Sequence, residues 1–145
     1  MEKVAIIGAS RGLGAQLARM IPLSVAVMAI ARNEDRLLQL QKQLGEHVQI
    51  RAIDVTKDFD KMLTALRAFQ PTRVFYLAGG GPYGDFQKKA WKDHIWAWEV
   101  TFLSAARLVH ALLNETSPQI VLCGSSVAEN AGDAQAASYA SAKHA

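Results

Sequence analysis

The first fourteen residues constrain the fold more than any other part of the chain. An apolar run, 3–7, leads into a turn with three glycines, Gly8, Gly12 and Gly14, and a helical pattern follows. Consecutive β-branched residues are typical of a parallel strand that is buried on both faces. Glycines let the backbone turn sharply and approach a ligand closely. Because the helix directs unpaired N–H groups at the turn, we expect this segment to bind a phosphate or pyrophosphate.

The rest of the chain repeats the alternation of strand and helix. Further strands are expected at 24–31, 47–53, 72–77 and 119–123, helices at 13–21, 33–45, 56–70, 91–114 and from Ser138 onward, and a loop at 124–137. Short links between alternating strands and helices indicate an α/β fold, a Rossmann-type doubly wound parallel sheet. Right-handed crossovers and a reversal of winding after the third strand predict the strand order 3-2-1-4-5. Ligands of such sheets bind outside the carboxyl ends of the strands, where the turn 8–14 and the glycine-rich loop 79–84 are both expected.

The composition narrows the class of function. With 145 residues and 50% hydrophobic content, the chain fits one domain with a core. Its net charge of +3 is spread along the sequence, so we expect no nucleic-acid-binding surface. The apolar stretch 20–31 is too short to span a bilayer, and the N-terminus leaves no room for a signal peptide, so a cytoplasmic location is expected. The one cysteine, Cys123, excludes an internal disulfide and a cysteine metal cage, and is expected to be buried at a strand end.

The end of the second expected strand indicates which dinucleotide would bind. A site for NAD has a carboxylate there, about twenty residues after the glycine turn. This chain has Arg32 at that place and Arg11 within the turn. Because guanidinium groups bind phosphate well, the pair favours NADP, with its 2′-phosphate, over NAD. For either arginine alone, a solvated surface charge is the alternative.

A second group of residues has the chemistry of an acid–base catalyst. Tyr139 and Lys143 are four residues apart and therefore share one face of a helix. A lysine cation near a phenol stabilises the phenolate, so the tyrosine can exchange a proton near neutral pH. Ser126 lies thirteen residues before Tyr139, at the end of the fifth strand. The three residues together are much more specific than the tyrosine and lysine alone.

These motifs resemble those of the short-chain dehydrogenase/reductase family. The Gly-x-x-x-Gly-x-Gly spacing of 8–14 matches the family's glycine turn, although Ile7 stands where a threonine is usual. The resemblance implies that Ser126 polarises a substrate carbonyl and that Tyr139 gives it a proton as hydride arrives from NADPH. It further implies that Lys143 holds the nicotinamide ribose and tunes the tyrosine.

The resemblance also implies the other cofactor contacts. An acidic residue at the end of the third strand, here Asp54, touches the adenine amine in the family; a turn or helix-capping aspartate is the alternative. No metal is expected. The expected cofactor-binding residues are Gly8, Ser10, Arg11, Gly12, Leu13, Gly14, Arg32, Asp54, Val55, Ala78, Gly79, Gly80, Tyr139 and Lys143.

Two positions depart from the family's pattern. The fourth strand of relatives ends in Asn-Asn-Ala-Gly, whereas residues 76–79 read Tyr-Leu-Ala-Gly. Thr101 aligns with the asparagine of the proton relay; threonine can hydrogen-bond a water but lacks the amide's second polar atom. We include Thr101 as a fourth catalytic residue. Three of the four histidines, His94, His110 and His144, are expected to have surface or packing roles.

The long helix 91–114 carries an apolar stripe that is expected to be core or subunit contact. The stripe consists of Ile95, Trp98, Phe102, Ala106, Val109 and Leu113. In many relatives this helix and the helix of Tyr139 form the subunit contact. A homo-oligomer through 91–114 is therefore a possibility that the resemblance raises.

The resemblance spans the whole chain but only the first part of the family's fold. We therefore expect a single dinucleotide-binding domain over 1–145, incomplete at its C-terminus, that binds cofactor but turns over carbonyl substrates negligibly. The function predicted is that of an NADP(H)-dependent oxidoreductase that reduces a carbonyl, or oxidises an alcohol, of a small molecule. A nucleotide-sugar epimerase or dehydratase, and a dinucleotide-binding or regulatory module whose catalysis has decayed, are the alternatives.

Overall fold

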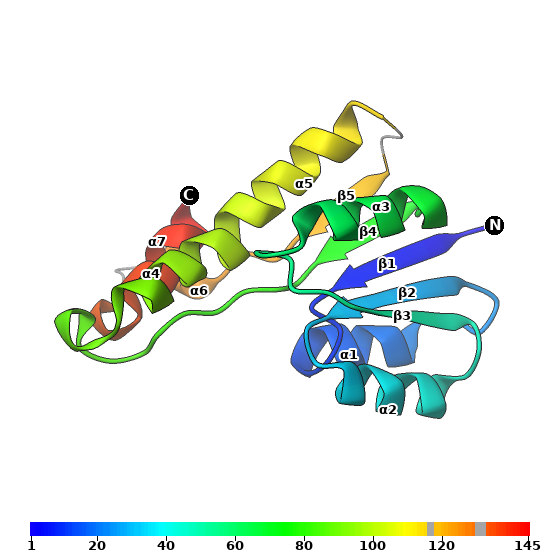
Figure 1. Ribbon diagram of the computed structural model, residues 1–145, viewed down its shortest axis with the longest axis horizontal. Coiled ribbons are helices and arrows are strands. Elements are labelled where there is room, and N and C mark those ends of the chain that lie inside the picture. Colours follow the sequence, from blue (N-terminus) through cyan, green and yellow to red (C-terminus); the bar gives the residue numbers. More distant parts are fainter. Residues whose placement is uncertain (116–117, 130–132) are drawn as a thin grey trace.

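Five short apolar strands form the centre of the computed structural model, which describes all residues except 116–117 and 130–132. The strands are β1 (Lys3–Ile7), β2 (Ala26–Ala31), β3 (Val48–Ala52), β4 (Arg73–Tyr76) and β5 (Gln119–Leu122). They pair in parallel in the order β3-β2-β1-β4-β5, which confirms the predicted strand order (Figure 1).

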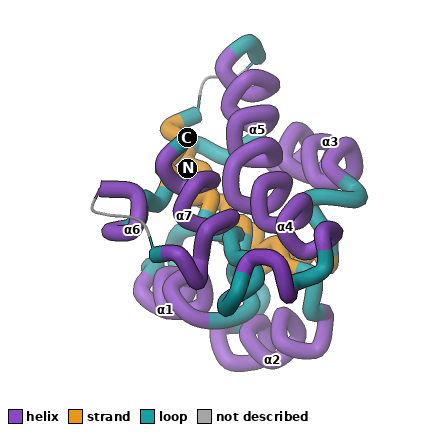
Figure 2. Tube along the Cα trace, turned by 90° about the vertical axis from the view of Figure 1, so that its left-hand side faces the viewer, coloured by secondary structure: helices purple, strands orange, loops and turns teal. Residues whose placement is uncertain are grey.

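Helices cover both faces of this sheet. They are α1 (Gly12–Met20), α2 (Glu34–Leu44), α3 (Phe59–Phe69), α4 (Trp91–Trp98), α5 (Ser104–Leu113), α6 (Ser126–Glu129) and α7 (Ala137–His144). Figure 2 shows α1 and α2 on one side of the strands and α3 and α5 on the other. In Figure 1, α4, α6 and α7 lie beyond the carboxyl ends of the strands. None of the described helices is long and apolar enough to cross a membrane.

Alternate residues of the central strand supply two separate cores. Val4 and Ile6 of β1 are buried with residues of α1 and α2, whereas Ala5 and Ile7 are buried with residues of α3 and α5. Successive side chains of a strand point to opposite faces, so a strand between two helical layers must be apolar at every position. This confirms the prediction that the first strand is buried on both faces.

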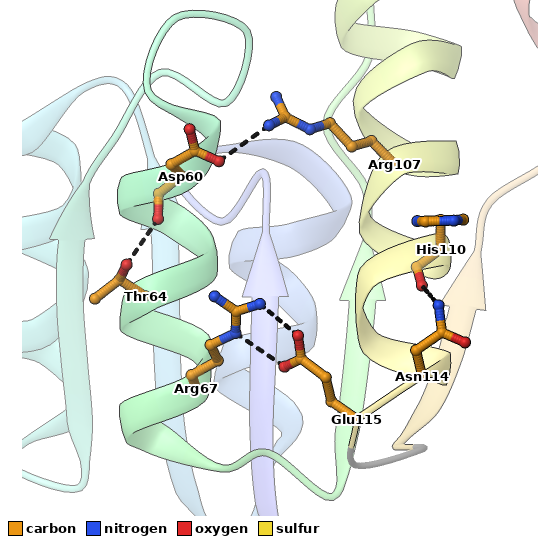
Figure 3. Close-up of polar contacts among 7 residues, drawn as sticks. All are labelled: Asp60, Thr64, Arg67, Arg107, His110, Asn114 and Glu115. Carbon is orange, nitrogen blue, oxygen red and sulfur yellow. Dashed lines mark hydrogen bonds and ion pairs between the residues drawn. The ribbon is translucent and has the colours of Figure 1, made fainter.

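Polar contacts at the surface join α3 to α5 (Figure 3). Arg67 of α3 makes a two-pronged ion pair with Glu115, just after α5, and Arg107 of α5 binds Asp60 of α3 with an N–O distance of 3.0 Å. Exposed ion pairs contribute little stability, so the buried apolar contacts hold the two helices on the sheet. The guanidinium of Arg107 also lies 4.0 Å from the centre of the Phe59 ring.

The predicted helix 91–114 forms, but its buried face differs from the prediction. A π-helical turn, Glu99–Leu103, connects α4 to α5. Phe102 and Leu113, which belong to the predicted stripe, are exposed. The buried side chains lie one position earlier and are His94, Ala97, Val100, Thr101, Ser104, Ala105, Leu108 and Leu112. The assignment of the predicted stripe to the core is therefore wrong. The prediction followed the large apolar side chains of the helix, whereas many of the side chains on its closely packed face are small.

Two further expectations near β5 are corrected by the structure. The Cys123 side chain is exposed rather than buried, because it follows the edge strand β5, whose end is not covered. The segment 124–137 is not wholly a loop, since Ser126–Glu129 is helical and Ala134–Ala136 forms a 3₁₀ turn. Residues 130–132 of that segment lie outside the described part of the chain.

Candidate functional site

A cleft of about 670 Å³ lies at the carboxyl ends of the strands. Its wall includes residues that follow strands β1, β2, β3 and β4. Eleven of the predicted cofactor-binding residues line it: Gly8, Ser10, Arg11, Gly12, Leu13, Gly14, Arg32, Asp54, Val55, Ala78 and Gly79. Residues that are far apart in the sequence thus meet where a doubly wound sheet binds its ligands.

The glycines of the turn have two different roles. A Cβ atom at Gly8, where φ is +93°, would lie 2.6 Å from the Ala78 nitrogen, and a Cβ at Gly14 would lie 2.1 Å from the Gly8 carbonyl oxygen. These two glycines therefore let β1, α1 and the end of β4 approach closely. Gly12, with φ +55°, has open space in front of it and lines the cleft.

The N-terminus of α1 borders the same cleft. Arg11 is the N-cap residue, and its side chain makes no capping hydrogen bond to the helix. The first helical residues, Gly12 to Gly14, line the cleft. Amide groups at a helix N-terminus and the helix dipole favour a bound anion. This end of the cleft therefore suits a phosphate group.

Three arginines line the cleft against one carboxylate. Arg11 and Arg32 were predicted, and Arg36 joins them from the first turn of α2. Asp54 is the one acidic residue in the described lining. This excess of positive charge would offset the negative charge of a ligand with several phosphates.

Asp54 is held in a turn at the end of the third strand. Its Oδ1 accepts hydrogen bonds from the Thr56 amide, at 3.0 Å, and from the Thr56 hydroxyl, at 2.7 Å. Burial raises the pKa of the Asp54 carboxyl, but the Thr56 hydrogen bonds and the Arg32 and Lys57 cations outweigh it and hold this pKa below the usual value. Asp54 therefore is a turn aspartate that stays ionised and also lines the cleft.

Nine lining residues were not among the predicted cofactor-binding residues. Five are apolar residues at or next to strand ends, namely Ile7, Ile30, Ala31, Ile53 and Leu77, and the other four are Asn33, Arg36, Trp96 and Val100. Asn33 is the N-cap residue of α2, and its Oδ1 accepts the Arg36 amide hydrogen at 3.0 Å. Trp96 and Val100 are four residues apart on the helix that follows the glycine loop, and that spacing was the available signal.

Three of the four predicted catalytic side chains, Thr101, Tyr139 and Lys143, lie beside Gly79. A Cβ atom at Gly79 would lie 3.6 Å from Thr101 Oγ1, 3.8 Å from Tyr139 Cε2 and 3.9 Å from Lys143 Cε. The Lys143 nitrogen lies 5.8 Å from the centre of the Tyr139 ring. Because Gly79 also lines the cleft, the tyrosine and lysine are next to the expected cofactor site.

Two of these polar groups bind the backbone. The Thr101 hydroxyl accepts the Gly80 amide hydrogen at 3.2 Å and donates to the Gly80 carbonyl at 3.1 Å. The Lys143 ammonium donates to the Cys123 carbonyl at 2.6 Å. Thr101 therefore anchors the glycine loop to the long helix, and Lys143 anchors α7 to the end of β5.

Tyr76, the last residue of β4, stands at the position of the first asparagine in the Asn-Asn-Ala-Gly that the resemblance leads one to expect. Its hydroxyl donates to the Val100 carbonyl in the π turn at 2.5 Å, and burial raises the pKa of this phenol. A neutral, buried tyrosine thus joins β4 to the helix that carries Thr101. The replacement changes the local packing but keeps the strand attached to the helix.

The remaining expected residues lie on α6, α7 and the helices around them. Ser126 is the first residue of α6, which packs against α7. His94 is buried, with Nδ1 2.6 Å from Ser138 Oγ and Nε2 3.0 Å from the Phe86 carbonyl oxygen. Ser138 immediately precedes Tyr139, so His94 has a packing role that fixes the start of α7. His110 and His144 are exposed.

Comparison with solved structures places the fold among known proteins. A short-chain dehydrogenase/reductase from Burkholderia vietnamiensis is 25% identical, with a TM-score of 0.82 over 99% of this chain and 72% of that one. An alcohol dehydrogenase from the archaeon Thermococcus sibiricus, complexed with 5-hydroxy-NADP, is 27% identical, with a TM-score of 0.80 over 99% and 66%. Actinorhodin polyketide ketoreductase with NADPH is 23% identical, with a TM-score of 0.84 over 99% and 60%.

The chain therefore spans between 60% and 72% of the length of these three proteins. A search of curated proteins found no match. The family model described as short chain dehydrogenase matches residues 2–145. The protein belongs to the short-chain dehydrogenase/reductase family.

Proposed function

We propose that this chain is the cofactor-binding and catalytic part of an NADP(H)-dependent oxidoreductase that acts on a carbonyl or alcohol group of a small molecule. The observation that supports this most is the cleft lined by the open glycine turn and three arginines, with Tyr139 next to the lining residue Gly79. Two structures similar to this one, the Thermococcus sibiricus alcohol dehydrogenase and the polyketide ketoreductase, have an NADP-type cofactor in their descriptions. The substrate is identified only by its reacting group, a carbonyl or an alcohol.

The residues of the cleft fit a phosphorylated dinucleotide. The amides of Gly12 and Leu13 would hold the pyrophosphate, because Gly12 leaves open space in front of the uncapped helix end. Arg11 and Arg32 would bind the 2′-phosphate. Asp54, ionised at neutral pH, would accept the adenine amine hydrogen.

The catalytic roles are those that the family resemblance implies, and Thr101, Tyr139 and Lys143 lie together beside Gly79. NADPH, when bound, supplies the hydride that reduces the carbonyl carbon. The Ser126 hydroxyl would donate a hydrogen bond to the carbonyl oxygen, and the Tyr139 phenol would give that oxygen a proton, so the carbonyl becomes an alcohol. The Lys143 cation, 5.8 Å from the tyrosine ring centre, favours the phenolate left behind. Thr101 supports this arrangement by holding Gly80.

Calorimetric titration with NADP⁺ and NAD⁺ tests the cofactor assignment. We expect NADP⁺ to bind at least about tenfold more tightly, since the phosphate would meet two cations. Arg32→Ala is expected to weaken the binding of NADP⁺ by about tenfold and the binding of NAD⁺ by less than about twofold. The control Arg51→Ala removes an exposed arginine of β3 that does not line the cleft. Equal affinities of the unmodified protein for the two nucleotides would contradict the proposal.

A dinucleotide-binding module without catalysis is the second candidate. It is favoured by the engagement of the Thr101 hydroxyl and the Lys143 ammonium with backbone carbonyls. Because the chain by itself is expected to turn over carbonyl substrates negligibly, Tyr139→Phe is made in a form that carries the rest of the family's fold, where it separates the two functions. In a reductase, this change abolishes NADPH-dependent reduction of carbonyl compounds and leaves the NADP⁺ affinity unchanged. A protein that binds NADP⁺ but lacks this activity, with or without Tyr139, would be the module.

We also propose that α4 and α5 are a surface for self-association. Large apolar side chains are exposed along these helices and the π turn between them: Trp91, Phe102, Leu103 and Leu113. Light scattering during size-exclusion chromatography would show an oligomer that Leu103→Lys dissociates. A monomer at every protein concentration would contradict this. The cytoplasmic location expected from the sequence stays a prediction.

A further inference from the structure

Trp96 of α4 joins the cofactor cleft to the glycine-rich loop. Its indole lines the cleft. A Cβ atom at Gly80 would lie 3.1 Å from Trp96 Cη2, so the edge of the ring packs on the backbone of the loop. The Arg32 guanidinium carbon lies 5.0 Å from the centre of the same ring. The indole therefore connects the end of β2 to the loop after β4.

The contact with Trp96 restricts a side chain that would otherwise be free. Arg32 is exposed at the end of β2, and an exposed arginine loses many rotamers when it binds a phosphate. A guanidinium placed over an indole ring is attracted by the ring's quadrupole. The Asp54 carboxylate attracts the same cation. Together the ring and the carboxylate hold the guanidinium at the cleft before any ligand arrives.

We propose that Trp96 is a specificity-determining residue for the cofactor. Its indole orients Arg32 toward an adenosine 2′-phosphate and so raises the preference for NADP over NAD. The inference rests on the proposed function, because it needs Arg32 to bind that phosphate. Orientation in advance increases affinity by lowering the conformational cost of binding. An indole that instead stacked on the adenine ring would strengthen the binding of NADP and of NAD equally.

Calorimetric titration with 2′,5′-ADP and 5′-AMP separates these roles, because the two probes differ only in the 2′-phosphate. We expect Trp96→Leu to weaken the binding of 2′,5′-ADP by about two- to fivefold, the size of one exposed cation–π contact, and to leave the affinity for 5′-AMP unchanged within error. Trp91→Leu is the matched control, since this tryptophan is exposed on the same helix and does not line the cleft. In the background of Arg32→Ala, Trp96→Leu is expected to have no further effect.

Three results decide the matter. Equal weakening of both probes by Trp96→Leu, or additive effects with Arg32→Ala, would overturn the role of Trp96 while the preference for NADP stands. Equal affinity of the unmodified protein for both probes would refute the proposed NADP preference and this inference with it. If Trp96→Leu unfolds by circular dichroism, Trp96→Met, whose longer and flexible side chain adapts better to the gap that the indole leaves, gives the same test.

Discussion

Replacing Gly14 by alanine sets helix propensity against close packing. Gly14 is inside α1, where alanine is favoured over glycine by about 1 kcal/mol. However, the new Cβ would lie 2.1 Å from the Gly8 carbonyl oxygen, whereas ordinary carbon–oxygen contacts are about 3.3–3.6 Å. The backbone must therefore shift by more than about 1 Å. Because the obstructing atom belongs to the backbone, no change of rotamer relieves the contact.

The expected net effect of Gly14→Ala is destabilisation. Overpacking costs about 1–3 kcal/mol, and a backbone contact of this kind belongs at the upper end of that range. Subtracting the gain in helix propensity leaves about 2 kcal/mol. With a urea m-value of about 2 kcal/mol per M, the unfolding midpoint falls by about 1 M. Circular dichroism during urea titration measures this shift.

Gly12→Ala is the matched control for that experiment. A Cβ at Gly12 meets nothing within 4 Å, but the φ of +55° costs an alanine about 1–2 kcal/mol. We expect a smaller fall in the midpoint, about 0.5–1 M, together with weaker NADP⁺ binding, because the methyl group enters the cleft. If the urea midpoint of Gly14→Ala is at or above that of the unmodified protein, the gain in helix propensity exceeds the cost of the backbone contact and the turn relaxes easily.

Three further substitutions test the core, the cleft and the start of α7. Leu108→Ala removes a fully buried side chain and should lower the free energy of unfolding by about 2–5 kcal/mol, against less than about 0.5 for the exposed Leu38→Ala. The lowered pKa of Asp54 means that its carboxylate stabilises the fold above the unfolded value of 3.8 and that this contribution is lost as pH falls through the folded value. Asp54→Asn should therefore flatten the fall of the urea midpoint between about pH 5 and pH 2. His94→Ala removes two buried hydrogen bonds and should cost about 2–4 kcal/mol, whereas the exposed His110→Ala should leave the midpoint unchanged.

Apolar runs and glycine positions were sufficient to predict the sheet. β1 alternates between two cores, so every residue from Val4 to Ile7 has to be apolar, and such a run has few alternatives to a central parallel strand. The helix 91–114 shows the limit of the same reasoning. Both of its faces are apolar, and the buried one includes the small residues Ala97 and Ala105, so hydrophobicity by itself could not distinguish them.

The candidate site divides in a similar way. Strand ends and motif spacing were enough to predict that Gly12, Arg32 and Asp54 lie at one edge, because parallel strands bring their carboxyl ends together. The contact of Arg32 with Trp96 depends on how α4 lies against the sheet, and no periodicity encodes that.

Local patterns along the chain therefore determined the order of the elements, the glycine turn and the types of charge at the strand ends. Only the tertiary structure decided which partner each polar side chain has for its hydrogen bonds and contacts. Thr101 anchors Gly80, Lys143 anchors the end of β5, and the His94 ring contacts the Ser138 hydroxyl. The physical reason is that backbone geometry follows from short-range sequence, whereas a partner for a polar group depends on the distance between segments that the sequence separates widely.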